Sequence, residues 1–257
     1  MNSTGARALI DVLLEQGVDT VFGYPGSAVL DIYDELYKCD KIRHILTCHE
    51  QAAAHAADGY ARATGRTGVV IATSGPGATN LVTGIAAAYM DSSPVVAITG
   101  NVKTSLLGSD SFQEVDIAGV TMPVTKYSFI ASGERGVAQD VREAFSIAQS
   151  GRKGPVLVDI PADIAAQSEE YEHAPKSEPA PAKEPEEDEL ERAAQMIEKA
   201  KRPLIYVGGG AISSGASDAL KTFAQKLHIP VACSMMGLGA YPCSAELFLG
   251  LGGMHGN

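Results

Sequence analysis

Short apolar runs and amphipathic stretches alternate along the first part of the chain. Strand-like runs rich in β-branched residues lie at 18–23, 42–47, 68–73, 94–99 and 155–160. Stretches with helical spacing lie at 28–38, 50–64, 77–90 and 136–150, and a further helix is expected between a Ser3 or Thr4 cap and a Gly17 stop. The strands show little polar alternation, which is typical of strands covered on both faces. The pattern predicts an α/β fold with a parallel sheet and right-handed crossovers.

A segment rich in Pro, Glu and Ala, EEYEHAPKSEPAPAKEPEEDELE, interrupts this alternation and is typical of an extended, solvated linker. After it, PLIYVGGG, SSGASDALKTFAQKLH and IPVACS predict a second strand–helix–strand unit. We expect a first domain over 1–165, a linker over 166–188 and the start of a Rossmann-like α/β domain over 189–257. Two strands are a small part of such a domain, so we expect a piece of a longer protein. A small complete domain is the alternative.

The acidity of the chain is concentrated in that linker. The formal net charge is −11, and residues 169–191 carry ten acids against Lys176 and Lys183, a net of −8 that leaves −3 for the rest. This distribution argues against nucleic acid or an anionic membrane surface as partner. No apolar run is long enough to span a membrane, the N-terminus lacks a signal pattern, and four cysteines show no metal-ligand spacing. We expect a cytoplasmic protein with reduced cysteines, although four cysteines could also pair.

Loops that follow the predicted strands form the candidate site, because parallel sheets bind ligands at the carboxyl ends of their strands. These loops contain GYPGSA, CHE, SGPGATN and GNVKTSLLGSDSFQEVD. The second holds Glu50, at the start of the helix predicted over 50–64. As a first-turn acid, Glu50 would stabilise the helix N-terminus by about 0.3–1 kcal/mol. Alternatively, it is a functional carboxylate at the ligand edge, which Ala52, Ala53 and Ala54 leave poorly solvated.

Two other kinds of site find little support in the sequence. His44, His49 and His55 are not spaced three or four residues apart, so no pair shares a helical face and we predict no metal site. GGGAISSG at 208–215 is a weak dinucleotide motif with no acid after the next strand. Phosphate binding by that loop is plausible, whereas an ordinary NAD site is not.

The order of the motifs resembles the large catalytic subunit of acetolactate synthase (acetohydroxyacid synthase), a thiamine-diphosphate enzyme. The matching segments cover almost the whole chain except the linker: VFGYPGSAVLDIYDELY, CHEQAAAHAADGYARATG, ATSGPGATNLVTGIAAAYMDSSPVVAITG, FQEVDIAGV, SGRKGPVLVDIPADI and MMGLGAYP. The resemblance implies a pyrimidine-binding domain followed by part of a flavin-binding-like domain. It also implies that Glu50 hydrogen-bonds N1′ of the aminopyrimidine and promotes formation of the cofactor ylid, which attacks pyruvate.

The same resemblance assigns further residues and partners. Phe112 and Gln113 would line the pocket for a second 2-oxo acid, which is pyruvate or 2-oxobutyrate. The residues implied to bind thiamine diphosphate beside Glu50 are Pro25, Gly26, Ser27, Ala28, Pro76 and Asn80. Those implied to bind FAD, which this family does not use for redox, are Arg152, Gly208, Gly209, Gly210, Met254, His255 and Gly256.

Family members hold the cofactor diphosphate and Mg²⁺ in a third domain marked by Gly-Asp-Gly, a motif that this chain lacks. The resemblance therefore implies an inactive fragment of a homodimeric or homotetrameric enzyme with a small regulatory subunit. The sequence departs from the family pattern at Ser27, where a glycine is usual, and at Ala162, where a lysine is usual. The alternatives are another thiamine-diphosphate decarboxylase or lyase, the pyrimidine-binding subunit of a split enzyme, or a plain nucleotide-binding module.

Overall fold

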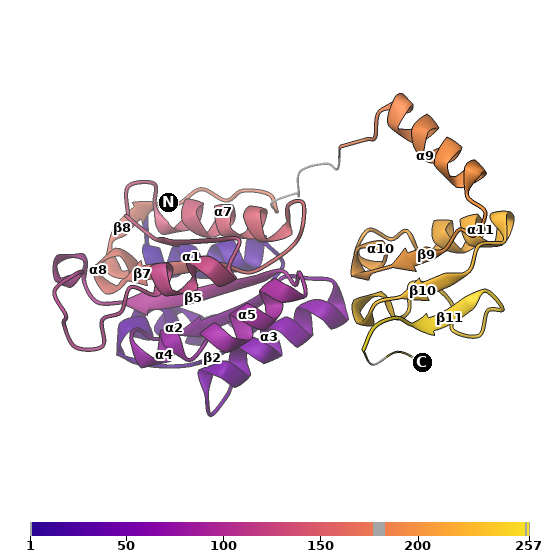
Figure 1. Ribbon diagram of the computed structural model, residues 1–257. Helices are drawn as coiled ribbons and strands as arrows, with labels where there is room; N and C mark the ends of the chain where they lie inside the picture. Colours follow the sequence, from indigo (N-terminus) through magenta and orange to yellow (C-terminus); the bar gives the residue numbers. More distant parts are fainter. Residues whose placement is uncertain (1, 177–182, 255, 257) are drawn as a thin grey trace. The chain divides into compact units, whose positions relative to one another are not determined.

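The computed structural model describes residues 2–176, 183–254 and 256, and it divides the chain into two compact units (Figure 1). The boundary between the units falls between residues 181 and 182. Part of the predicted linker, 177–182, lies outside the described residues.

A six-stranded sheet in which every pair of neighbours is parallel forms the centre of the first unit. The strand order is β3-β2-β4-β5-β7-β6. This confirms the predicted parallel α/β sheet, and five of the strands were predicted; the edge strand β6 was not. The strands are β2 (Thr20–Tyr24), β3 (Arg43–Leu46), β4 (Gly68–Ala72), β5 (Val95–Asn101), β6 (Tyr127–Ile130) and β7 (Val156–Pro161).

Helices cover both faces of this sheet. The predicted helix over 77–90 is interrupted at Asn80 and Leu81, so that it forms a short α4 and a longer α5. Thr4 caps α1 by accepting a hydrogen bond from the Arg7 N–H, as the sequence predicted. The helices are α1 (Gly5–Glu15), α2 (Leu30–Tyr37), α3 (Glu50–Thr64), α4 (Pro76–Thr79), α5 (Val82–Met90), α6 (Ile117–Thr121), α7 (Val137–Gln149) and α8 (Ala162–Ala166).

Two hydrophobic cores lie on opposite faces of the sheet, because successive residues of a strand point to opposite sides. In β4, Val69 and Ile71 pack in the core formed with α1, α2 and α7. Val70 and Ala72 pack in the second core, with α3 and α5. Burial on both faces explains why the strand sequences are almost continuously apolar.

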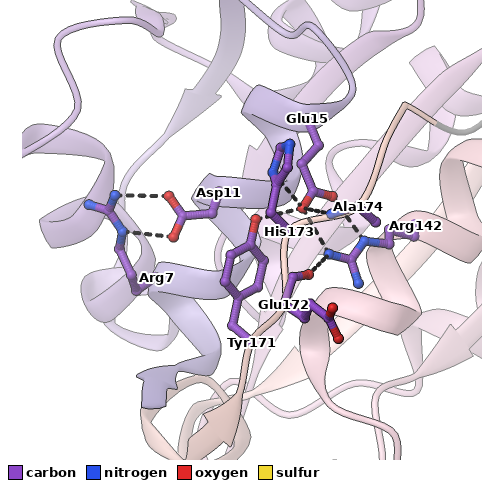
Figure 2. A network of polar contacts seen from close by, with 8 residues as sticks. All are labelled: Arg7, Asp11, Glu15, Arg142, Tyr171, Glu172, His173 and Ala174. Carbon is purple, nitrogen blue, oxygen red and sulfur yellow. Dashed lines mark hydrogen bonds and ion pairs between the residues drawn. The ribbon is translucent and has the colours of Figure 1, made fainter. Parts of the chain in front are cut away.

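The segment after α8 packs against the rest of the first unit. Strand β8 (Ser168–Glu170) pairs antiparallel with β1 (Asn2–Thr4), and Tyr171 is buried. The Glu15 carboxylate accepts hydrogen bonds from the guanidinium of Arg142, the hydroxyl of Tyr171 and the N–H of Ala174 (Figure 2). The first unit therefore continues past residue 165, and the start of the segment predicted as a linker packs against α1 and α7.

The second unit is a three-stranded parallel sheet in the order β11-β10-β9. Its small core lies around Val207, Val231 and Tyr241, while α9 contributes no buried residue. The strand β11 was not predicted. The elements are β9 (Ile205–Val207), β10 (Val231–Cys233), β11 (Phe248–Leu251), α9 (Glu187–Lys199), α10 (Gly209–Ser213) and α11 (Ser217–Leu227).

The described residues settle two smaller points. All four cysteines are free thiols, so the alternative of paired cysteines is wrong. In the described parts of the chain, no helix combines the length and apolar character needed to cross a bilayer, and no three His, Cys, Asp or Glu side chains gather as potential metal ligands.

Candidate functional site at the carboxyl edge of the sheet

The chain leaves the neighbouring strands β2 and β4 in opposite directions. From β2 it crosses to the outer strand β3, and from β4 it proceeds to β5 on the other side. Such a topological switch point opens a crevice for ligands beyond the carboxyl ends of the strands. The segments that follow the four strands at this edge are 25–29, 47–49, 73–75 and 102–116.

Glu50 is the first residue of α3 and lies half-buried at this edge. Its Oε2 accepts a hydrogen bond of 2.9 Å from Nδ2 of Asn80, which follows α4. A Cβ on Gly77 would lie 3.3 Å from Oε1 of Glu50 and 2.7 Å from Cγ2 of Thr73, so the backbone of α4 comes close to the carboxylate because residue 77 is a glycine. No donor among the described residues bonds Oε1, which leaves that oxygen available to a ligand.

The surroundings of Glu50 differ from those expected from its alanine neighbours. Ala53 and Ala54 are buried on the sheet side of α3, and Ala52 is exposed. The groups beside the carboxylate are instead the amide of Asn80 and the backbone around Gly77. Of the three alanines expected to leave Glu50 poorly solvated, Ala53 and Ala54 are buried and Ala52 is not, because a helix turns successive side chains to different sides.

The turn after β2 lies against the residue that follows β4. The N–H of Ala28 donates a 3.2 Å hydrogen bond to Oγ1 of Thr73. A Cβ on Gly26 would come within 2.5 Å of the Thr73 side chain, so this approach requires glycine. Pro25 and Ser27 are exposed in the same turn. The turn predicted to meet the pyrimidine therefore lies beside the segment that contains Gly77.

The long segment after β5 also reaches this edge. A Cβ on Gly75 would lie 2.7 Å from the carbonyl oxygen of Gln113, so the two backbones are in close contact. Gln113 adopts a left-handed φ of 57°, which is uncommon for a residue other than glycine. The neighbouring Phe112 is 85% exposed and fills no cavity of the first unit. Pro76, also exposed, follows Gly75 directly.

Among the predicted site residues of the first unit, Arg152 lies away from this edge. Arg152 precedes β7 at the amino edge of the sheet, where its guanidinium donates to Oγ of Ser92 and to the carbonyl oxygens of Tyr89 and Met90 at the end of α5. Those in the second unit are Gly208, Gly209, Gly210, Met254 and Gly256. His255 lies outside the described residues.

The glycine turn after β9 is closely packed at Gly209 and open at Gly210. Gly208 is the N-cap of α10, and a Cβ on Gly209 would lie 3.1 Å from the Met236 side chain. Gly210 has open space around its Cα, and Met254 is 91% exposed. The predicted flavin-binding role of these residues stays a prediction.

Sequence reasoning missed three polar residues at the carboxyl edge. Thr73 accepts a hydrogen bond from the N–H of Ala28. Asn101 and Asp159 are buried near the ends of β5 and β7. Thr73 could have been identified because it comes directly after an apolar strand in ATSGPG. Asp159 offered a weaker signal, a single acid inside the apolar run PVLVDI.

Comparison with known families agrees with this geometry. The family model "Thiamine pyrophosphate enzyme, N-terminal TPP binding domain" matches residues 3–120, which contain Glu50 and its partners. The model "Thiamine pyrophosphate enzyme, central domain" matches residues 190–257. The chain therefore belongs to the thiamine pyrophosphate enzymes.

Within that class, the chain is similar to acetolactate synthase large subunits. It is 52% identical over 256 residues to the large subunit from Corynebacterium glutamicum, covering 98% of this chain and 41% of the relative. It is 49% identical to the isozyme 3 large subunit from Escherichia coli and 48% identical to the large subunit from Cyanidium caldarium, covering 98% of this chain and 45% of each relative. The chain thus spans less than half the length of these relatives and corresponds to their N-terminal part.

Proposed function

We propose that this chain is the N-terminal portion of an acetolactate synthase catalytic subunit. The complete enzyme would condense pyruvate with a second 2-oxo acid, pyruvate or 2-oxobutyrate, with loss of CO₂. The observation that carries the proposal is the Glu50 carboxylate, held by Asn80 at the switch point of a sheet whose sequence matches acetolactate synthase large subunits.

The residues at this edge fit the pyrimidine end of thiamine diphosphate. Asn80 fixes one oxygen of Glu50, and the absence of a side chain at Gly77 leaves space beside the other. The Glu50 carboxyl group would form a hydrogen bond with a ring nitrogen of the bound pyrimidine and share a proton with it. Burial, and then the negative charge of Glu50, raise the pKa of Tyr33, so the Tyr33 hydroxyl stays protonated beside the site. When bound, the cofactor supplies the carbanion chemistry that no side chain provides.

The remaining parts of the proposed enzyme follow from its family. Gly26, Ser27 and Ala28 would approach the pyrimidine through their backbone, with Pro25 and Pro76 at the rim. Gln113 and Phe112 would bound the pocket of the second 2-oxo acid. The glycine turn of the second unit would bind FAD, and Mg²⁺ would bind with the cofactor diphosphate. The role predicted for Arg152 in FAD binding stays a prediction. We further propose a homodimer or homotetramer in the cytoplasm, with a small regulatory subunit.

Substitution of Glu50 tests the proposed mechanism. In the longer protein that contains this chain, Glu50→Gln is expected to lower acetolactate turnover by at least about a hundredfold, in the range of acid–base groups. Glu143→Gln on α7 provides a control, because Glu143 lies in a helix on the opposite face and pairs with Arg135. Near-normal turnover of Glu50→Gln, with the control also active, would remove Glu50 from the mechanism.

We also propose that the 257-residue chain is inactive by itself, because it contains no Gly-Asp-Gly motif to hold the cofactor diphosphate. Acetolactate formation from pyruvate, thiamine diphosphate and Mg²⁺ by the purified chain would contradict this proposal. The complete protein under the same conditions serves as the positive control.

A further inference from the structure

A buried aspartate joins the ends of two central strands at the carboxyl edge. Asp159 in β7 is completely buried, and its Oδ1 accepts a 2.6 Å hydrogen bond from Oγ1 of Thr99, its register partner in β5. Its Oδ2 accepts a hydrogen bond from Nδ2 of Asn101, the last residue of β5. Both carboxyl oxygens therefore accept hydrogen bonds from β5 within the sheet.

Asn101 connects Asp159 to the segment that follows β5. Its Oδ1 accepts a 2.7 Å hydrogen bond from the N–H of Val102, the first residue after β5. On the other face of β5, a Cβ on Gly100 would lie 2.4 Å from the carbonyl oxygen of Ala28. The end of β5 thus fits between Asp159 on one side and the turn at Ala28 on the other.

The base of the segment 102–116 is held a second time by a residue of α8. Asp163, which follows β7 in α8, accepts hydrogen bonds from the N–H of Thr104 at 2.9 Å and from its Oγ1 at 2.5 Å. Farther along, Glu114 accepts from the N–H groups of Gly108, Ser109 and Ser111. The segment is therefore anchored at its base by Asp163. Its far end, where Gln113 contacts Gly75, is held by hydrogen bonds within the segment.

Burial of the Asp159 carboxyl has an energetic disadvantage that an apolar residue would avoid. Burial raises the pKa of Asp159 to about 7, and the negative charge of Asp116 adds to this, against the hydrogen bonds from Thr99 and Asn101. A valine or leucine would suit the core of β7 better on hydrophobic grounds alone. An aspartate at position 159 is explained if it fixes the conformation of the chain at the end of β5.

We infer that Asp159 is a positioning residue for the segment 102–116, acting through Asn101. By fixing the direction in which the chain leaves β5, it sets where Phe112 and Gln113 stand relative to Gly75 and the Glu50 edge. Its role in the reaction rests on the proposed function, whereas its control of the segment does not.

Limited proteolysis of the 257-residue chain tests control of the segment. Lys103 is an exposed tryptic site between Val102 and Thr104, the two anchored residues. We expect Asp159→Ala to speed cleavage at Lys103 by about tenfold to a hundredfold, the range for one buried group left without its partner. Asp159→Asn should change it less than about threefold, because an amide can still bond both neighbours.

Two further variants keep this test decisive. Asp140→Ala removes another buried aspartate, in α7, and should leave cleavage at Lys103 unchanged. Should Asp159→Ala not fold, Asn101→Ala removes the link to Val102 while retaining the bond between Thr99 and Asp159, and the same selective increase is expected. Equal acceleration at Lys103 and at the partly buried Arg142 would indicate general unfolding and overturn the inference, as would unchanged cleavage at Lys103.

Kinetics of the longer protein test the role in the reaction. Asp159→Ala is expected to raise KM for the second 2-oxo acid by about tenfold and to change kcat by less than about threefold, with Asp159→Asn near the wild type. A loss confined to kcat would overturn this role. Normal turnover of Glu50→Gln would contradict the proposed function instead, while the proteolysis result would still decide whether Asp159 positions the segment.

Discussion

Glu15 is a residue of the first unit whose replacement should reveal a large favourable electrostatic contribution to stability. Its side chain is completely buried at the end of α1, and Arg142 reaches it from α7 with two hydrogen bonds of 2.8 and 2.9 Å (Figure 2). Tyr171 and Ala174 add two more donors from the segment after β8. We expect Glu15→Gln to weaken all of these contacts without changing the size of the side chain.

The magnitude follows from the pKa of Glu15. Burial alone raises this pKa, but the hydrogen bonds from Arg142, Tyr171 and Ala174 outweigh burial and lower it from 4.5 to about 2. Because the pKa is lower in the folded state, the carboxylate stabilises the fold above pH about 4.5, and this stabilisation is lost as the pH falls toward 2. The difference corresponds to about 3 kcal/mol at neutral pH.

Urea unfolding measures this contribution for the first unit alone when it is monitored by hydrogen exchange in peptides from α1 and α7. Glu15→Gln should lower the free energy of unfolding by about 3 kcal/mol at pH 7, and the difference from the wild type should shrink below pH about 4. Asp11→Asn is the matched control on the same helix. Its partner Arg7 is 43% exposed, so the pair should contribute less than about 1 kcal/mol.

The result that would refute this reasoning is equally specific. If Glu15→Gln and Asp11→Asn reduced stability by the same small amount, the buried network would contribute no more than a surface ion pair. A loss for Glu15→Gln that persisted unchanged at pH 3 would show that its cause is packing and not the charge of the carboxylate.

Two other predictions concern the candidate site. Gly77→Ala should displace the Glu50 carboxylate, because the added methyl group would lie 3.3 Å from Oε1 of Glu50 and 2.7 Å from Cγ2 of Thr73. We expect the longer protein to bind thiamine diphosphate at least about tenfold more weakly by calorimetry. Gly59→Ala, in open space on α3, should bind normally and be slightly more stable. The raised pKa of Asp159 means that between pH 4 and 7 the folded state retains a proton that the unfolded state loses. As the pH rises from 4 to 7, this residue therefore lowers the free energy of unfolding by up to about 4 kcal/mol. Asp159→Asn should therefore make unfolding free energy fall less steeply over that range, and an unchanged slope in urea titrations would contradict the assignment.

The elements with strong local patterns could be predicted from the sequence. Helix α3 was predicted at its observed bounds because Glu50 and Gly65 enclose an uninterrupted helical pattern, and Gly65 adopts the left-handed conformation that ends it. Elements with weak local patterns were missed. Strand β8 is three residues long and polar, and it forms only because β1 supplies its partner.

The same distinction holds for the candidate site. The sequence by itself determined that Glu50 follows a strand at the ligand edge and that glycine turns follow the neighbouring strands, because both are properties of short stretches. Only the tertiary structure decided that Asn80 holds Glu50, that Thr73 meets Ala28, and that Asp159 joins Asn101 across 58 residues of chain. These contacts depend on which strands become neighbours, and strand order is set by the packing of the whole sheet and not by any local pattern.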